Sequence, residues 1–151
     1  MPTFRAEDPG SADAVALIDA LSAALAALTG DSGRSSFAID DVRAAGACFA
    51  VARDANGHAV GCGALRPLAD GIAEVKRMFA RPGHPGTGSA LLAFLEARAA
   101  ALGYVAIWLE TRAVNQRALR FYLARGYAAI PNYGRYAGNA QAVCLAKQLP
   151  R

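Results

Sequence analysis

The sequence lacks the patterns that mark several large classes of protein. It has no run of five or more basic residues, and its net charge of +4 is spread along the chain. Because nucleic-acid-binding domains concentrate basic residues on one stripe, we expect no nucleic acid partner. The N-terminal MPTFRAEDPG has no apolar signal core, and no segment has the 18 or more uninterrupted apolar residues of a membrane span. We therefore expect a cytoplasmic protein with no membrane partner.

Cysteine is scarce and its spacing is uninformative. Cys48, Cys62 and Cys144 lie in apolar, strand-like runs without CxxC or Cys/His spacing, so we expect buried, reduced core residues and no metal site. None has the Asp/His partners of a covalent acyl-enzyme. The chain also has no internal repeat and no low-complexity tract, and its 151 residues fit one domain over residues 1–151.

The first half predicts a strand, a helix and an antiparallel meander. Ser11 is expected to cap a helix that ends near Leu28, and the polar loop Thr29–Ser36 follows it. The apolar residues expected on the buried face of this helix are Val15, Ile18, Leu21, Leu25 and Leu28. We expect strands at 3–7, 47–54, 59–68 and 72–80, an Asn56-Gly57 hairpin turn, and a short helix at 39–45.

The second half alternates between helices and strands. We expect helices at 86–102 and 114–125, each stopped by a glycine, and strands at 104–110, 127–130 and 142–148. The run YVAIWLE is apolar almost throughout, which is typical of a strand buried on both faces. This order predicts a mixed α/β fold, with helices on both faces of one sheet.

The turn around Gly86-Thr87-Gly88 separates a strand from a helix, a setting that offers backbone N–H groups to a phosphate. A P-loop would need Lys-Ser/Thr after its last glycine, and Ser89-Ala90 stands there instead. The dinucleotide fingerprint GxGxxG is also absent. A tight turn into a helix, without a ligand, explains the glycines equally well.

The surrounding motifs resemble the acyl-coenzyme A core of the GNAT superfamily of N-acetyltransferases over residues 46–149. They are the strand AEVKRMFARP, the turn PGTGSALL, LGY before an apolar strand, and the helix NQRALRFYLARGY. The resemblance implies six to seven mostly antiparallel strands, a splayed parallel pair formed by the strands at 72–80 and 104–110, and about four helices. It also implies acetyl-CoA as acyl donor, without a metal.

The resemblance carries over to particular residues. The backbone of Met78 and Phe79 is expected to pair with the pantetheine arm. Four residues of the later helix are expected to contact the coenzyme. They match the family pattern or lie one turn beyond it, and they are Asn115, Ala118, Tyr122 and Arg125. The residues expected to offer N–H groups to the pyrophosphate are Gly86, Thr87, Gly88, Ser89 and Ala90.

The glycine turn departs from the family pattern. Gly83 stands where the family has Gln or Arg, Pro85 has no N–H to donate, and the turn is about two residues short. We therefore expect weaker or differently shaped phosphate binding. His84 is a substitute donor or an exposed turn residue.

Amine acetylation needs a base, a stabilised oxyanion and an acid for the leaving thiolate, because an alkyl amine with a pKa of about 10.4 is protonated at neutral pH. By the resemblance, Tyr122 is the acid; alternatively, it is a core aromatic residue. Glu74 is the predicted base, and strand alternation would place Glu74, Lys76 and Met78 on one face. Alternatively, Glu74 forms an ion pair with Lys76 or Arg77. Backbone N–H groups near Met78 would hold the oxyanion.

The acceptor is harder to predict. The loop Thr29–Ser36 and four further residues are candidates for an amine pocket, namely Arg66, Glu110, Tyr133 and Tyr136. We expect N-acetyl transfer by direct attack to a primary amine of a small molecule, with a peptide or protein lysine as other acceptors. A catalytically silent acyl-CoA sensor or interaction module with the same fold is the alternative. The sequence leaves open whether the protein forms a homodimer.

Overall fold

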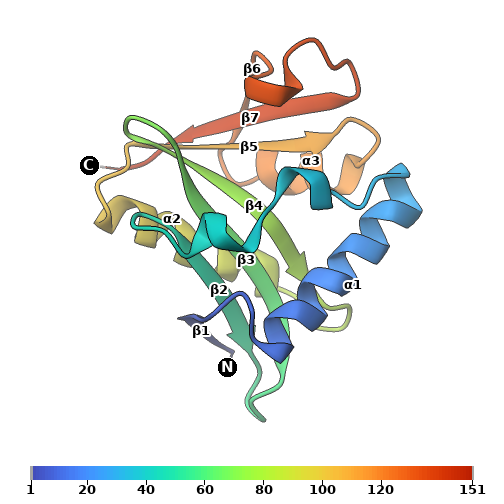
Figure 1. Cartoon of the computed structure of the whole chain (residues 1–151), viewed down its shortest axis with the longest axis vertical. Helices are drawn as coiled ribbons and strands as arrows, with labels where there is room; N and C mark the ends of the chain where they lie inside the picture. Colours follow the sequence, from blue (N-terminus) through green and yellow to red (C-terminus); the bar gives the residue numbers. More distant parts are fainter. Residues whose placement is uncertain (1, 151) are drawn as a thin grey trace.

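The computed structural model describes residues 2–150, and it describes no side chain at Ser36. One sheet of seven strands runs through the molecule in the order β1-β2-β3-β4-β5-β7-β6 (Figure 1). The strands are β1 (Thr3–Ala6), β2 (Cys48–Arg53), β3 (Ala59–Ala69), β4 (Ile72–Ala80), β5 (Ala106–Arg112), β6 (Ala128–Ile130) and β7 (Ala142–Gln148). The helices are α1 (Ala12–Thr29), α2 (Thr87–Ala101) and α3 (Gln116–Leu123), with short 3₁₀ helices η1 (Arg34–Ser36), η2 (Ile39–Val42) and η3 (Gly134–Tyr136). This mixed α/β architecture confirms the predicted fold.

The parallel pair β4 and β5 divides the sheet. Only Ile72–Glu74 of β4 pairs with β5, opposite Ala106–Trp108, and the two strands then separate (Figure 1). All the other neighbouring strands are antiparallel, and β5 pairs along its whole length with β7. The β5-facing edge of β4 from Val75 onward is therefore free of strand pairing.

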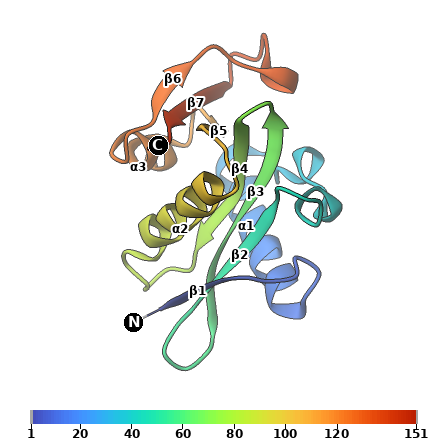
Figure 2. The same ribbon diagram turned by 90° about the vertical axis from the view of Figure 1, so that its left-hand side faces the viewer.

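Helices cover both faces of the sheet (Figure 2). On one face, α1 buries Leu17 and Ile18 against Phe49 and Val51 of β2. On the other face, α2 and α3 pack over the larger core, whose fully buried leucines are Leu65, Leu91, Leu92, Leu95, Leu109 and Leu145. Both layers bury apolar side chains against the sheet, and this burial supplies the main driving force for folding.

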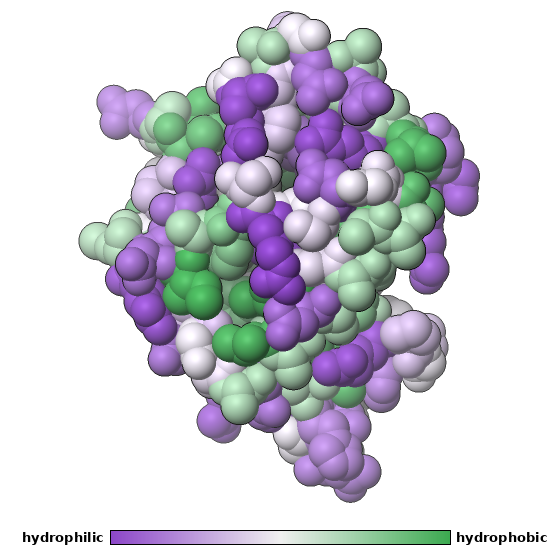
Figure 3. Space-filling view, turned by 45° about the vertical axis from the view of Figure 1, so that its right-hand side comes forward, coloured by the Kyte–Doolittle hydropathy of each residue, from purple (hydrophilic) through white to green (hydrophobic). Residues whose placement is uncertain are grey.

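Helix α1 begins as predicted, with Ser11 Oγ accepting a hydrogen bond from the Ala14 N–H at 3.1 Å. The predicted buried face was partly wrong, because Val15 is 38% exposed and Leu28 is 51% exposed. An alanine-rich helix is apolar all round, so its sequence period does not define one face. By length and composition α1 could also cross a membrane; 28% of it is buried, and those buried side chains pack on the sheet. Figure 3, which brings this side forward, shows hydrophobic side chains interspersed with hydrophilic ones.

The helix expected at 39–45 is only the 3₁₀ turn η2, so the described residues form three α-helices rather than four. Strand alternation in β4 was also predicted incorrectly. Arg77 has φ +56°, and the pairing of β3 with β4 shifts between Cys62 and Ala64, which marks a β-bulge. After the bulge, Met78 packs against the α2-side core, whereas Glu74 lies on the opposite face, which carries η2.

Replacing Leu95 by alanine tests the core on the α2 side. Leu95 is fully buried, so Leu95→Ala is expected to lower the free energy of unfolding by roughly 2–5 kcal/mol. Leu102, which is 46% exposed just beyond the same helix, provides the control, and Leu102→Ala is expected to stay within about 0.5 kcal/mol of the parent. Urea denaturation measures both; equal losses in the two variants would contradict the packing described.

Candidate active site

Two adjoining cavities lie where β4 and β5 separate. The larger, of about 140 Å³, is lined by residues of β4 and α3 that include Met78, Ala118 and Tyr122. The smaller, of about 100 Å³, lies under the segment Thr29–Ser36, which we call the acceptor loop. Glu110, Asn115 and Tyr136 line both cavities. Residues of β4, β5, α1 and α3 thus meet at one place.

The start of α2 has the geometry expected of a phosphate site. Gly86 is the N-cap residue with φ +82°, and nothing lies within 4 Å of where its Cβ would stand. The Thr87 N–H donates to the His84 carbonyl at 3.3 Å, which closes the shortened turn. The N–H groups of the first helical turn have no partner within the helix, so they and the helix dipole favour an anion. The turn residues named from the sequence lie together at this helix start, but the Ala90 N–H donates to the Gly86 carbonyl at 3.1 Å and so is already engaged within the chain.

Arg125 lies close to the same turn. Its guanidinium stacks on the Phe121 ring at 3.9 Å and donates to the Phe121 carbonyl at 2.9 Å. The Phe121 ring in turn lies 3.4 Å from where a Cβ on Gly88 would stand. Phe121 thus lies between the Arg125 guanidinium and the start of α2.

Helix α3 supplies three residues to the cavities. The Asn115 side chain caps the helix by accepting a hydrogen bond from the Ala118 N–H at 3.2 Å. Tyr122, only 9% exposed, meets the Phe121 and Tyr127 rings edge-on at 5.0 and 5.6 Å, and it also lines the larger cavity. Burial raises the pKa of its phenol, so the hydroxyl keeps its proton at neutral pH. Tyr122 is thus a core aromatic residue that also lies at the cavity wall with its phenol protonated.

Glu74 is enclosed in a polar network outside the linings of both cavities. One carboxylate oxygen accepts from Arg66 Nε at 2.8 Å, and the other accepts from the Tyr133 hydroxyl. Lys76 Nζ lies 3.7 Å from the first oxygen, and the Glu74 side chain is only 2% exposed. Burial and the neighbouring carboxylate raise the pKa of Tyr133. Of the residues expected in an amine pocket, Arg66 and Tyr133 thus bind Glu74 instead, whereas Tyr136 does line the cavities.

Glu110 is the functional candidate that the sequence reasoning undervalued. Its side chain is 13% exposed, and its Oε2 is buried without a hydrogen-bond partner among residues 2–150. The nearest ion-pair contact of this oxygen is Arg112 Nε at 3.7 Å. Burial raises the pKa of Glu110, and the cations of Arg112 and Lys76 partly oppose that rise. The sequence signal for Glu110 was a single acidic residue at the end of an apolar strand.

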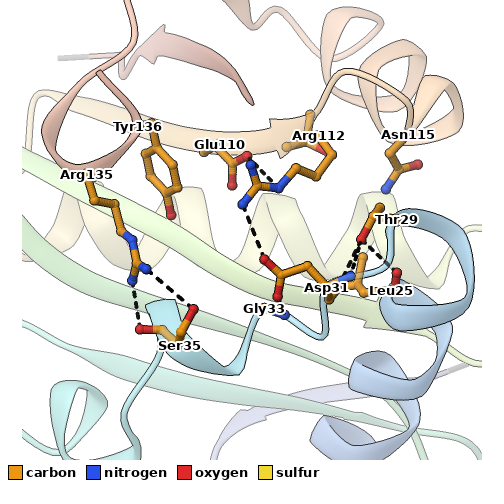
Figure 4. A pocket seen from close by; sticks show the side chains of 11 residues that line it. Leu25, Thr29, Asp31, Gly33, Ser35, Glu110, Arg112, Asn115, Arg135 and Tyr136 are labelled. Atoms are coloured by element: carbon orange, nitrogen blue, oxygen red, sulfur yellow. Dashed lines mark hydrogen bonds and ion pairs between the residues drawn. The ribbon is translucent and has the colours of Figure 1, made fainter. Parts of the chain in front are cut away.

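The acceptor loop is fastened over the smaller cavity from two sides (Figure 4). Arg112 of β5 reaches Asp31 at 3.5 Å, and Arg135 of η3 donates to the Ser35 carbonyl at 2.7 Å. These contacts join segments far apart in the chain. Both signs of charge therefore line the cavity, as the sequence predicted.

The cysteines offer no nucleophile. All three are free and buried, and burial raises their thiol pKa values, that of Cys62 to about 12. A thiol of this kind is almost wholly protonated at neutral pH and reacts poorly. Within the described part of the chain, no group of three or more His, Cys, Asp or Glu residues could hold a metal ion.

Valine at Gly86 tests the phosphate site. A β-branched residue does not hold φ +82°, so Gly86→Val should disturb the α2 entry and weaken coenzyme A binding by about tenfold or more. Gly57 provides a matched control in the β2–β3 hairpin, since it has φ +81° and equally open space. Gly57→Val is expected to cost similar stability and leave the coenzyme Kd unchanged in calorimetric titrations. Normal affinity in Gly86→Val would refute the assignment.

Comparisons with known proteins agree with this geometry. The model of the acetyltransferase (GNAT) family matches residues 16–127. A Klebsiella pneumoniae structure assigned to the acyl-CoA N-acyltransferases is 30% identical, with a TM-score of 0.83 and 99% of each chain covered. A search of curated protein sequences gives no match.

Two more distant structures share the fold. A GNAT-family acetyltransferase from Staphylococcus aureus is 15% identical, with a TM-score of 0.78 over 99% of this chain and 100% of the other. The PaiA N-acetyltransferase of Thermoplasma acidophilum, solved with coenzyme A, is 18% identical, with a TM-score of 0.72 over 98% and 99% of the two chains. With the family match over residues 16–127, the chain belongs to the GNAT family of acetyltransferases, whose acyl donor is acetyl-CoA.

Proposed function

We propose that this protein transfers the acetyl group of acetyl-CoA to a primary amine of a small molecule by direct attack in a ternary complex. One observation carries the proposal. Glu110 lines both cavities, and its carboxylate has one buried oxygen without a hydrogen-bond partner among the described residues. A protonated amine is the ligand that such an oxygen accepts best.

The larger cavity is the proposed place of the thioester. Met78 and Tyr122 line it, and the free edge of β4 runs along it toward α2. A pantetheine arm carries amides that can pair with a free strand edge in the manner of an added strand. The thioester carbonyl would then lie near the backbone of Met78, and its sulfur near the Tyr122 hydroxyl.

The smaller cavity is the proposed place of the acceptor. Its volume of about 100 Å³ suits a few non-hydrogen atoms, such as the amine end of a small molecule. The acceptor loop and Arg135 line it, and the Arg135 guanidinium donates to the Ser35 carbonyl of this loop (Figure 4). These dimensions favour a small amine, whose nitrogen would reach Glu110 between the two cavities.

The reaction follows from these positions. Glu110 takes one proton from the ammonium, and the amine nitrogen then attacks the thioester carbon to form a tetrahedral oxyanion. When the carbon–sulfur bond breaks, Tyr122 gives its proton to the thiolate and regains one from the new amide nitrogen. Glu110 finally releases its proton to solvent, so the products are the amide, the free thiol and one proton. A raised Glu110 pKa brings this base closer to neutral pH, where general bases are most effective.

Glu74 remains the base predicted from the sequence. Both of its oxygens are engaged by Arg66 and Tyr133, so using it would require breaking a buried ion pair or relaying the proton through a water. This cost favours Glu110 in our proposal.

Thiol release from acetyl-CoA tests the function itself. A panel of amines, from small primary amines and polyamines to lysine peptides, is expected to give amine-dependent release with at least one small amine. Tight coenzyme binding without release on any amine would instead support a silent acyl-CoA sensor. Release only with peptides would overturn the small-molecule acceptor.

Two glutamine variants separate the candidate bases. Glu110→Gln is expected to lower kcat/KM at pH 7 about 100-fold. Without the base only the neutral amine reacts, so the rate should recover as the pH approaches the amine pKa. The parent should instead lose activity only as the pH falls through the raised Glu110 pKa.

Glu74→Gln is the comparison, since it removes a charge from the neighbouring buried network. It is expected to lower stability while leaving the shape of the pH–rate profile unchanged. A parental profile in Glu110→Gln together with an alkaline-shifted one in Glu74→Gln would restore Glu74 as the base.

Removing the Tyr122 hydroxyl tests the acid. Tyr122→Phe is expected to lower kcat by about 10- to 100-fold and to change the coenzyme Kd less than twofold. Tyr127→Phe is the control, because Tyr127 is also buried but donates its hydroxyl to Glu96. That variant should lose stability and keep its turnover. Steady-state kinetics and calorimetry measure both, and an unchanged kcat in Tyr122→Phe would exclude the acid role.

A further inference from the structure

Arg77 is a buried cation that lacks an acidic partner. It is 8% exposed, and no carboxylate of residues 2–150 lies within ion-pair distance of it. Its Nε also has no hydrogen-bond partner among those residues. Burial lowers the pKa of its guanidinium. Because a buried charge without compensation is costly, the remaining contacts of Arg77 need a reason.

Those contacts all reach toward the acceptor side of the site. Nη2 donates to the Ile18 carbonyl at 3.3 Å and to the Ser22 hydroxyl, both on α1. Nη1 donates to the Ser32 carbonyl at 3.1 Å, in the acceptor loop. The guanidinium also lies 5.9 Å from the centre of the Phe37 ring. One side chain therefore joins α1 and the acceptor loop to β4.

The backbone of Arg77 forms the bulge of β4. Among residues 2–150 it is the one non-glycine residue with positive φ, a conformation that costs free energy for any residue with a Cβ. Met78, the next residue, lines the larger cavity. Arg77 thus lies between Met78, at the larger cavity, and the residues of α1 and the acceptor loop that its guanidinium contacts.

Gly33 fits this connection closely. A Cβ at Gly33 would stand 2.8 Å from Arg77 Nη1, so any other residue at this position would require the guanidinium to move. Gly33, Leu21 and Leu25 line the larger cavity together with Arg77. Loop, helix and guanidinium therefore form one packed wall.

We propose that Arg77 is a positioning residue for the amine acceptor, because its guanidinium fixes the wall of Leu21, Leu25 and Gly33 opposite Glu110 and Met78. The proposal rests on the proposed function, since it concerns the same site. It predicts that loss of the side chain displaces the acceptor wall and leaves the coenzyme site intact.

Glycine is the informative replacement. Arg77→Gly removes the guanidinium but tolerates φ +56°, so the bulge can persist. Hydrogen exchange by mass spectrometry should show faster exchange in residues 29–36 and unchanged exchange in residues 86–91. This readout needs no substrate, so it stays valid if the proposed function fails. The amine KM should rise about tenfold, while the coenzyme Kd changes less than twofold.

Arg53 is the matched control. It also ties α1 to the sheet, through Asp13 at 3.0 Å, but at the opposite end of the helix. Arg53→Gly is expected to leave the amine KM and the exchange of residues 29–36 unchanged. Methylguanidine added to Arg77→Gly should lower the amine KM again, and it should have no effect on Arg53→Gly.

Ser22→Ala keeps the proposal testable if Arg77→Gly does not fold. It removes one acceptor of the guanidinium from α1 and is expected to raise loop exchange and amine KM in the same direction, by a smaller factor. Parental exchange in residues 29–36 in the folded variants would overturn the proposal. Variants that lose affinity for the coenzyme but keep the parental amine KM would also overturn it.

Discussion

The early end of pairing between β4 and β5 is the constraint on which the site depends. The two parallel strands share hydrogen bonds only at Ile72–Glu74 and then diverge, while β5 remains fully paired with β7 on its other side. Backbone groups in a folded protein need partners, so the unpaired edge of β4 is suited to a ligand that supplies them. The pantetheine arm of acetyl-CoA has that chemistry. The opening is thus formed by the sheet itself, and α1 and α3 complete its walls.

The bulge at Arg77 adds a second consequence to the same strand. It turns the Arg77 side chain toward α1 and returns Met78 to the opposite face, against the α2-side core. One irregular residue therefore connects the edge that would bind the donor with the wall that would bind the acceptor. Glu110 on β5 faces both cavities across this opening. The proposed donor edge, base and acceptor wall thus come from different elements that the sheet brings together.

Much of this arrangement was predictable from the sequence, and the exceptions have physical reasons. Turn glycines, the Ser11 cap and the apolar run of β5 are local signals, and they located these elements to within two residues; β5, for example, was expected at 104–110 and lies at Ala106–Arg112. The spacing of Asn115, Ala118 and Tyr122 is also local, and those residues line one cavity. The bulge was missed because alternation assumes a regular strand. A register shift in β4 depends on pairing with β3, which no local pattern encodes.

The assignment of the two acids shows the same limit. Glu74 and Glu110 are both lone carboxylates in apolar strands, so the sequence alone does not distinguish them. The structure does, because Arg66 and Tyr133, which come from distant segments, occupy both Glu74 oxygens, whereas Glu110 Oε2 has no such partner among the described residues.

A crystal structure of the protein with acetyl-CoA would test the central claim most directly. The account predicts that the pantetheine arm pairs with the free edge of β4. It places the pyrophosphate at Gly86–Ala90 and the thioester between the Met78 backbone and the Tyr122 hydroxyl, beside Glu110. A coenzyme bound outside the opening between β4 and β5, or a thioester remote from both Tyr122 and Glu110, would contradict it.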